Sequence, residues 1–250
     1  MPTDRIPEIK SALVLGATSD IAIALAHLLS ARGVNLLLAA RNMNELKKTA
    51  GILNKYSSSK VTLLPFNALK FEKHASFAQN LPYIPDITIC AFGYLGNQQK
   101  AETDAAEQKL IYDTNYTGAV SILNHIVKLY EQKGTGIIVG ISSVAGDRIR
   151  QSNKYYGESK ADFSSYLYTL QQKLPADIHT IIVKPGFVNT KMTRHLKLPP
   201  FITATPNQVA TTILSAIDYK KKEIYVLPVW RLIMFVIKII PESIFKRLKM

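Results

Sequence analysis

One junction near the N-terminus sets the fold, where a short apolar run turns into an amphipathic segment: Ala12-Leu13-Val14-Leu15-Gly16-Ala17-Thr18-Ser19-Asp20-Ile21-Ala22. The continuous apolar run predicts a buried strand, and the spacing that follows predicts a helix. Gly16 permits the tight turn between them, while Thr18 and Ser19 can cap the helix or donate hydroxyls to a phosphate. Asp20 suits the helix N-terminus but sits close to any anionic ligand. The junction fits a dinucleotide-binding turn and a plain capped helix start equally well.

The same alternation continues along the chain. Seven segments predict strands: Ala12–Leu15, Asn35–Ala39, Val61–Phe66, Ile87–Ala91, Gly136–Ile141, Ile178–Val183 and Glu223–Val226. Five segments predict helices: Asp20–Arg32, Asn42–Tyr56, a long one over Asp104–Lys133, Asn153–Leu174 and Asn207–Tyr219. Because strands rich in Val, Ile and Leu suit a parallel sheet buried on both faces, we predict one α/β domain over residues 1–227. It is a Rossmann-like, doubly wound parallel sheet of about seven strands flanked by helices.

Composition narrows the possible partners. The chain has 250 residues, 47% of them hydrophobic, which fits one globular domain with a full core. The formal charge of +13 suits nucleic acid, a membrane surface or anionic substrates, but no polybasic block accompanies it, so we expect no nucleic-acid partner. Cys90 lies in an apolar run and predicts a buried core residue, and the scattered histidines predict no metal site. Residues 1–10 contain no apolar core, so we expect no signal peptide and a cytoplasmic location.

Ligands of a doubly wound sheet bind beyond the carboxyl ends of its strands, so the residues there carry the functional prediction. Arg41 follows the second predicted strand and suits the extra phosphate of NADP, although a solvated arginine would also tolerate NAD. Asn67 follows the third and can accept the adenine amino group or simply form a turn. After the fourth, Phe92 and Tyr94 alternate with glycines, as walls for a flat ligand or as packed loop aromatics.

Three further segments are polar where the surrounding pattern is apolar. Ser143, at the end of the fifth predicted strand, can hold a substrate oxygen. Asn115 lies within an apolar-faced helix and predicts either a catalytic amide or a buried amide bonded to backbone, and both can hold together. The loop Pro185–Thr190 offers a kink and a threonine for phosphate or carboxamide contacts.

Tyr156 and Lys160 are four residues apart on a predicted helix and therefore share one face. A phenol normally loses its proton near pH 10. An ammonium about 4 Å away favours the phenolate by about 4 kcal/mol at an effective dielectric of about 20, and so could lower the phenol pKa by up to about three units. The pair alone is a weak signal, because the same spacing occurs by chance on many surface helices.

Taken in order, these strand-end features resemble the short-chain dehydrogenase/reductase family over residues 10–227. The matching motifs lie at residues 16–22, 115–118, 142–146, 156–160 and 185–190. The resemblance implies an NAD(P)H-dependent ketone reductase with catalytic Asn115, Ser143, Tyr156 and Lys160. It implies cofactor contacts by Gly16, Thr18, Ser19, Asp20, Ile21, Arg41, Asn67, Ala68, Ala91, Phe92, Gly93, Tyr156, Lys160, Pro185, Gly186, Val188 and Thr190. Arg41 slightly favours NADP(H) over NAD(H).

Within the family, residues 16–22, 91–96, 146–153, 185–193 and 240–248 resemble the decaprenylphosphoryl-2-keto-ribose reductases, the second half of a 2'-epimerase. This resemblance implies a lipid-linked keto-sugar as substrate and a flavin-dependent oxidase as partner. Arg41 is not required by that activity, so another ketone substrate, lipid-linked or free, remains open. A membrane-attached module that senses the nucleotide without turnover is the alternative from another class.

Basic and aromatic side chains near the predicted site suggest how a substrate is held. We expect substrate contacts from Tyr94, Arg148, Arg150, Phe187 and Arg194. Arg148 and Arg150 lie between Ser143 and Tyr156, and Lys191, Arg194 and His195 follow the Pro-Gly loop, where a lid could lie. Such cations can bind a phosphate by charge-assisted hydrogen bonds, or form an ordinary solvated basic face.

Residues 228–250 form a separate apolar and basic extension, predicted to be an amphipathic helical tail. The apolar segment Leu227–Ile240 is shorter than the roughly 20 residues needed to span a bilayer, and Arg231 and Lys238 share one helical stripe. An interfacial helix at the inner face of the cell membrane fits this pattern, with Lys246, Arg247 and Lys249 attracted to anionic lipid. Packing against this chain or in a homodimer is the alternative.

Overall fold

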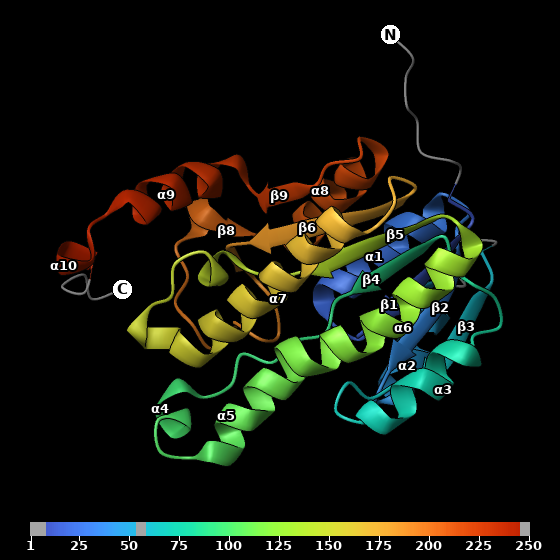
Figure 1. Cartoon of the computed structure of the whole chain (residues 1–250), viewed down its shortest axis with the longest axis horizontal. Helices are drawn as coiled ribbons and strands as arrows, with labels where there is room; N and C mark the ends of the chain where they lie inside the picture. The colour runs from blue at the N-terminus through green and yellow to red at the C-terminus, as the bar shows by residue number, and fades with distance from the viewer. Residues whose placement is uncertain (1–8, 54–58, 246–250) are drawn as a thin grey trace, which may run out of the picture.

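The structure, a computed structural model, describes residues 9–53 and 59–245 of the chain. Its centre is a seven-stranded parallel sheet in the order β3-β2-β1-β4-β5-β6-β9 (Figure 1). These strands are β1 Ser11–Leu15, β2 Asn35–Ala40, β3 Val61–Pro65, β4 Ile87–Cys90, β5 Gly136–Ile141, β6 Ile178–Pro185 and β9 Glu223–Val226. A separate two-stranded ladder pairs β7 Phe187–Val188 with β8 Thr203–Ala204. The predicted doubly wound sheet of seven strands is confirmed.

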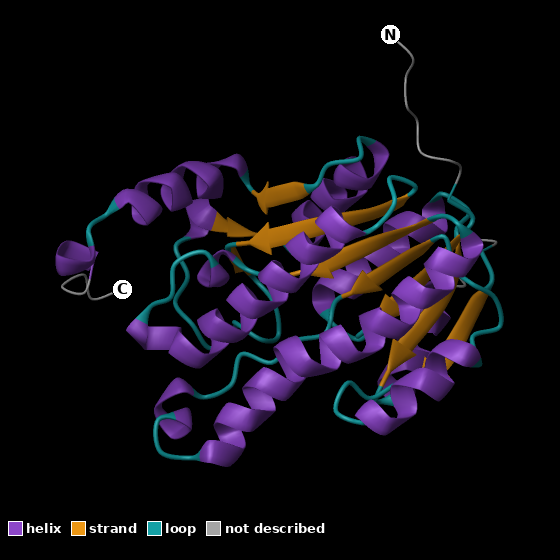
Figure 2. Cartoon of the chain, viewed as in Figure 1, coloured by secondary structure: helices purple, strands orange, loops and turns teal. Residues whose placement is uncertain are grey.

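Helices cover both faces of the sheet, as Figure 2 shows. They are α1 Asp20–Ala31, α2 Met43–Leu53, α3 His74–Gln79, α4 Gln98–Ala101, α5 Ala105–Tyr112, α6 Gly118–Lys133, α7 Lys154–Lys173, α8 Pro206–Asp218, α9 Pro228–Ile239 and α10 Glu242–Phe245. α1, α2 and α8 pack on one face, and α3, α6 and α7 on the other. Along β1, Ala12 and Val14 enter the first core and Leu13 and Leu15 the second, because successive strand residues point to opposite faces.

The strand order reverses between β1 and β4. The chain after β1 continues to β2 on one side of the sheet, and the chain after β4 continues to β5 on the other side. The connections after these two strands therefore diverge and leave an opening beyond their carboxyl ends. This opening holds the candidate site. Cys90 closes β4 and is buried in the core, as predicted.

The predicted long helix around residues 104–133 is confirmed as a continuous helical stretch over residues 105–133, with a π segment inside it. α5 and α6 are separated by a π turn over Asp113–Thr117. Gly118 begins α6, and a Cβ there would come within 2.3 Å of the Ala68 carbonyl oxygen and 2.8 Å of the Asp113 carbonyl oxygen. The chain at this point lies against another loop, and the wider turn places Asn115 on the inner side, where it is buried.

The C-terminal extension packs on the body through α9. Trp230 and Met234 are buried against Val144 and Phe187. The predicted basic residues 246–249, like the end of the predicted helix Asn42–Tyr56, lie outside the described residues. Within the described part of the chain, we find no helix with both the length and the apolarity to cross a bilayer.

Candidate active site

A cavity of about 530 Å³ lies at the carboxyl ends of the central strands. Every residue expected to contact cofactor lines it: Gly16, Thr18, Ser19, Asp20, Ile21, Arg41, Asn67, Ala68, Ala91, Phe92, Gly93, Tyr156, Lys160, Pro185, Gly186, Val188 and Thr190. They come from segments far apart in the chain, and the parallel sheet brings them together because its carboxyl ends share one edge. Ser143 lines the same cavity, while Asn115 lies just behind it.

The turn after β1 forms one end of the cavity. Gly16 has a φ of 83°, and a Cβ there would lie 2.6 Å from the Phe92 nitrogen, so only glycine fits. Ser19 is the N-cap of α1, its hydroxyl accepting the Ala22 N–H at 3.2 Å. The 12-residue α1 thus presents its positive end to the cavity, an arrangement suited to a pyrophosphate.

Asp20 is compensated by a basic residue from the opposite wall. The Lys191 backbone N–H donates to Asp20 Oδ2 at 2.6 Å, and Lys191 Nζ lies 2.8 Å from Glu45 Oε1 and 3.8 Å from Asp20 Oδ1. The loop after β7 is therefore tied to the starts of α1 and α2 across the cavity. Glu45 was not predicted as part of the site, since nothing in its sequence surroundings distinguishes it from an exposed helix residue.

Arg41 and Asn67 both line the cavity, but the Asn67 side chain already has a hydrogen-bond partner. Arg41 follows β2, and its side chain is exposed. Asn67 forms the turn that was its alternative interpretation, because its Oδ1 accepts the Leu69 N–H at 3.0 Å. Arg41 thus remains available to an anionic group, whereas the Asn67 amide oxygen already has one partner.

Tyr156, Ser143 and Lys160 meet at the other end of the cavity. Tyr156 and Lys160 lie one turn apart on α7, and Lys160 Nζ is 5.9 Å from the centre of the Tyr156 ring. Lys160 Nζ donates to the Ile141 carbonyl oxygen at 3.0 Å. Ser143 caps a short 3₁₀ turn, its hydroxyl accepting the Ala145 N–H at 3.1 Å.

Burial dominates the acid–base properties of this pair. It raises the pKa of Tyr156 to about 12, and a hydrogen bond from Ser143 opposes the rise. Burial also lowers the pKa of Lys160 to about 8. The expectation that Lys160 brings the Tyr156 pKa toward neutral is therefore wrong for the chain without ligand. The same burial destabilises both the phenolate and the ammonium that was expected to stabilise it.

Asn115 is a buried amide bonded to backbone, as one of its two interpretations predicted. Its Oδ1 accepts the Tyr94 N–H at 2.8 Å, and its Nδ2 donates to the Tyr94 carbonyl at 2.8 Å and to Ser159 Oγ at 3.1 Å. A Cβ at Gly93 would lie 3.2 Å from Asn115 Oδ1 and 3.5 Å from Lys160 Nζ. Asn115 thus fixes the loop after β4 at the point where it passes Lys160.

The residues predicted to bind substrate do not line this cavity. The Tyr94 hydroxyl donates to Glu107 Oε1 at 2.8 Å and so points toward α5. Arg148 pairs with Glu242 at 2.7 Å, and its guanidinium carbon lies 4.4 Å from the Phe245 ring centre, so it is engaged by α10. Phe187 packs edge-on against Trp230 with ring centres 5.3 Å apart. Arg194 is exposed, and burial lowers the pKa of the half-buried Arg150.

Several lining residues escaped prediction, including Ala40, Asn42, Phe66, Leu69, Thr114, Ile141, Ser142, Met192 and Thr193. Most neighbour a predicted residue, so the strand-end rule could have found them. Ser142 is adjacent to Ser143 but points the other way, with its hydroxyl 2.6 Å from Ser164 Oγ and 3.0 Å from the Lys160 carbonyl. It fixes α7, and only three-dimensional contacts reveal this.

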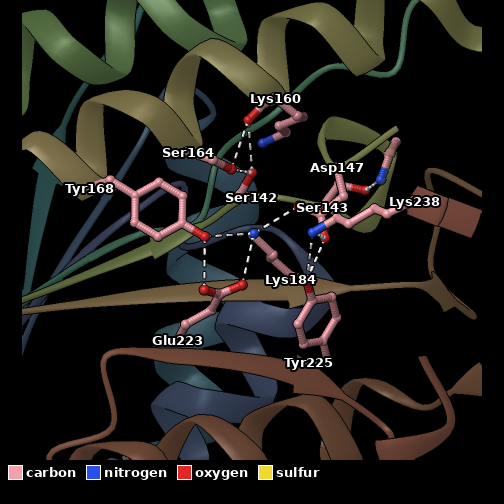
Figure 3. A network of polar contacts seen from close by, with 11 residues as sticks. Ser142, Ser143, Asp147, Lys160, Ser164, Tyr168, Lys184, Glu223, Tyr225 and Lys238 are labelled. Atoms are coloured by element: carbon pink, nitrogen blue, oxygen red, sulfur yellow. Dashed lines mark hydrogen bonds and ion pairs between the residues drawn. The ribbon is translucent and has the colours of Figure 1, made fainter. Parts of the chain in front are cut away.

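An ion cluster lies behind the loop that follows Ser143 (Figure 3). Lys184, on β6, pairs with Asp147 at 2.7 Å and with Glu223 at 2.8 Å, and its side chain is 3% exposed. Lys238 on α9 reaches Asp147 at 3.0 Å. The cluster therefore joins the sheet, the loop after β5 and the C-terminal extension.

The comparisons with known proteins agree with this geometry. The short chain dehydrogenase family profile matches residues 10–199. An uncharacterized oxidoreductase of Mycobacterium tuberculosis is 32% identical over 94% of this chain and 96% of its own length. An uncharacterized oxidoreductase of Streptomyces coelicolor is 33% identical over 99% of each chain.

A solved structure shows the same fold. The chain is similar to a short chain dehydrogenase from Burkholderia cenocepacia, crystallised in complex with NADP, with a TM-score of 0.81 at 18% identity. The match covers 98% of this chain and 99% of that one. The chain belongs to the short-chain dehydrogenase family and is an NAD(P)-dependent oxidoreductase of alcohol or ketone groups.

Proposed function

We propose that the protein reduces a ketone with NAD(P)H, and that the observation carrying this proposal is the meeting of Tyr156, Ser143 and Lys160 in a cavity lined by a dinucleotide-type turn. The cavity fits such a cofactor. Gly16 leaves room where any Cβ would collide with Phe92, and the N-terminus of α1 opens beside it. When bound, the cofactor supplies the hydride.

Residues of the chain carry out the other parts of the reaction, which are proton donation, stabilisation of charge and alignment of the site. With its pKa near 12, Tyr156 carries its proton at neutral pH and can donate it to the developing alkoxide. The Ser143 hydroxyl holds the carbonyl oxygen as negative charge forms on it. The Lys160 ammonium stabilises the phenolate left on Tyr156. Asn115 aligns the loop after β4 through its bonds to Tyr94 rather than acting directly.

NADP(H) is the proposed cofactor. Arg41 lines the cavity after β2 with an exposed guanidinium, which suits a 2'-phosphate. The similar Burkholderia cenocepacia enzyme was solved with NADP, which supports the same choice.

For the substrate, we propose a keto-sugar attached to a polyprenyl phosphate, as in decaprenylphosphoryl-2-keto-ribose reductase. The support is the motif resemblance, together with the position of α9, whose Trp230 and Met234 pack against Val144, the residue after Ser143. Arg150 is half-buried, and the structure gives it no carboxylate partner among the described residues, so it can donate hydrogen bonds to a phosphate. A flavin-dependent oxidase would supply the ketone in the first half of an epimerisation.

The test compares Tyr156→Phe with Tyr155→Phe. Tyr155 is adjacent, and its hydroxyl accepts a bond from Gln108 at 3.2 Å outside the cavity. NADPH consumption is followed with a lipid-phosphate keto-pentose and with free sugar ketones. We expect Tyr156→Phe to lose about 10²–10⁴-fold in turnover while still binding NADPH, and Tyr155→Phe to stay near wild type. Full turnover in Tyr156→Phe contradicts the proton-donor role, and NADPH binding without turnover on any ketone favours a sensing module.

A further inference from the structure

Helix α9 has two apolar faces, and only one of them is used. Trp230, Met234 and Ile237 pack against the body. A second set at the spacing i, i+3, i+4, i+7 is exposed: Leu232, Phe235, Val236 and Ile239 are 64%, 64%, 47% and 66% exposed. Leu232 and Phe235 also line a groove that α9 forms with α8 and β9. A helix that is apolar on both sides is normally covered on both sides. The outer stripe therefore lacks a partner among the described residues.

The helix is held so that this outer stripe cannot turn inward. Trp230 Nε1 donates to the Ile202 carbonyl at 2.9 Å, and Lys238 pairs with the Asp147 carboxylate at 3.0 Å. α10 is fixed in turn, because Glu242 pairs with Arg148 and Phe245 lies under the same guanidinium. Figure 3 shows Lys238 pointing into the ion cluster. The exposure of the outer stripe is thus set by contacts on the opposite side of the helix.

Other exposed apolar side chains accompany the stripe. Nearly all the large apolar side chains exposed in the described residues come from two regions, 149–201 and 229–244; the exceptions are Ile52 and Tyr219. Phe201 is 82% exposed and adjoins Ile202, which Trp230 contacts. Met192 is exposed and also lines the cofactor cavity. Exposed apolar side chains are therefore present on α9, next to the residue that Trp230 contacts, and at the cofactor cavity.

Charge identifies what covers this surface. Residues 191–197 contain no acid; Lys191 is paired with Glu45 and Asp20, whereas Arg194 and Lys197 are exposed. On the C-terminal extension, Arg231 is exposed, Lys238 is paired with Asp147, and the acid Glu242 is paired with Arg148. Three further basic residues follow in the sequence, Lys246, Arg247 and Lys249, which lie outside the described residues. A second copy of the chain would bring two such basic borders together, whereas an anionic bilayer surface matches both the apolar stripe and its cationic border.

We propose that the outer stripe of α9, with α10 and Phe201, docks on an anionic membrane surface. The 12 residues of α9 extend about 18 Å, well short of the roughly 30 Å hydrocarbon core, so the helix lies in the interface plane. Docking places the Met192 side of the cavity next to the bilayer. The proposal goes beyond the reductase function, because membrane binding requires neither cofactor nor ketone.

The test is co-sedimentation of the full chain with vesicles. Phosphatidylcholine vesicles containing phosphatidylglycerol are compared with pure phosphatidylcholine vesicles at about 0.1 M and about 1 M salt. Wild type is compared with Leu232→Ser/Phe235→Ser, and the matched control is Ile52→Ser/Tyr219→Ser, which removes exposed apolar groups elsewhere. Circular dichroism verifies folding, and turnover on a water-soluble ketone reports on the catalytic site separately.

We expect wild type and the control to bind the anionic vesicles, less at high salt, and the α9 variant to bind at least about tenfold more weakly. Turnover on the soluble ketone stays unchanged in both variants. Equal binding by the α9 variant overturns the proposal. So does a lipid-free dimer of wild type that becomes a monomer in the α9 variant, since it assigns the stripe to a second copy. Neither result bears on the reductase function.

Discussion

Two buried groups with opposite protonation preferences share the reacting end of the cavity. Tyr156 holds its proton to a pKa of about 12, and Lys160 loses its own near a pKa of about 8. Proton donation by Tyr156 leaves a phenolate, which needs the Lys160 ammonium beside it. At neutral pH both groups are therefore in the form that ketone reduction requires.

This arrangement predicts how ketone reduction depends on pH. We expect kcat/KM to be level below pH 8 and to fall above it toward tenfold per pH unit, because the Lys160 ammonium is lost as pH rises through its pKa of about 8. The measurement is kcat/KM on a soluble ketone from pH 6 to pH 10, at about one-unit steps.

Unfolding does not explain such a decline. The folded-state pKa of Lys160 lies below its unfolded value, so the unfolded chain binds the extra proton and this group makes the fold more stable as pH rises from about 8. A profile that stays level to pH 10 contradicts the role given to the ammonium.

The preference for NADPH over NADH is a second property that we propose depends on a single residue, Arg41. Arg41→Ala should weaken NADPH binding by about 10–100-fold and leave NADH binding nearly unchanged, because one charge-assisted contact to a phosphate is worth about 1.5–3 kcal/mol. Fluorescence titration with each nucleotide gives both constants. The control is Arg32→Ala, an exposed arginine paired with Asp218. Equal losses for NADH and NADPH would place Arg41 outside the phosphate site.

The sequence could predict which residues line the site, but not what they contact. Gly16, Arg41 and Ser143 follow strands, and the carboxyl ends of parallel strands necessarily share one edge. Arg148 also comes after a predicted strand, the fifth, yet it pairs with Glu242, 94 residues later in the chain. A partner at such sequence separation follows from packing, and local pattern carries no information about it.

At the scale of elements, α9 and the loop after β6 are fitted to each other. A Cβ at Gly186 would lie 1.9 Å from Trp230 Cε2. Gly186→Ala should therefore cost about 1–3 kcal/mol in unfolding free energy by displacing the indole. In a Trp230→Leu background the same change should cost much less, because leucine ends before the indole atoms that meet the new methyl.

Chemical denaturation of the two single variants and the double variant measures this coupling. Gly51→Ala is the matched control, since a Cβ there has nothing within 4 Å and alanine favours a helix. If Gly186→Ala costs the same in both backgrounds, the packing of α9 on this loop is not what requires the glycine.

The boundaries of the helices and strands show where the hydrophobic pattern of the sequence no longer predicts the structure. The strands came from continuous apolar runs, and the predicted Glu223–Val226 and Gly136–Ile141 match β9 and β5. The π turn at Asp113–Thr117 left no trace, because the apolar spacing before and after it continues at a helical period. Gly118, directly after it, lies against the Ala68 carbonyl, and this close approach is tertiary.

At the scale of the whole molecule, the hydrophobic periodicity of the sequence was enough to predict the sheet, because a chain of alternating strands and helices has few right-handed arrangements. It could not place the C-terminal extension. α9 is apolar on both faces, so its composition fits the body, a second subunit or a membrane equally well. Only the Trp230 and Lys238 contacts decide which face is inward.

The ion cluster around Lys184 ties these parts into one unit. It connects β6, β9, the loop after β5 and α9 through Asp147, Glu223 and Lys238. Burial opposes each shift, but the hydrogen bonds with Asp147 and Glu223 raise the pKa of Lys184, and the same bonds lower the pKa values of the two carboxyl groups. The carboxylates therefore stabilise the fold above their unfolded pKa values of about 4, and lose that stabilisation as pH falls through their lower folded values.

Lys184→Met should accordingly lower the unfolding free energy by about 3–5 kcal/mol at pH 7, because among the described residues it leaves Asp147 paired with Lys238 and Glu223 without a cationic partner. Arg32→Met, which breaks an exposed pair with Asp218, should cost at most about 1 kcal/mol. Urea denaturation at neutral pH and near pH 4 separates charge from packing. The deficit of Lys184→Met should shrink at the lower pH, where the carboxylates that have lost Lys184 take up protons. A deficit that is equal at both pH values means that the lysine stabilises the fold through its aliphatic stem rather than its charge.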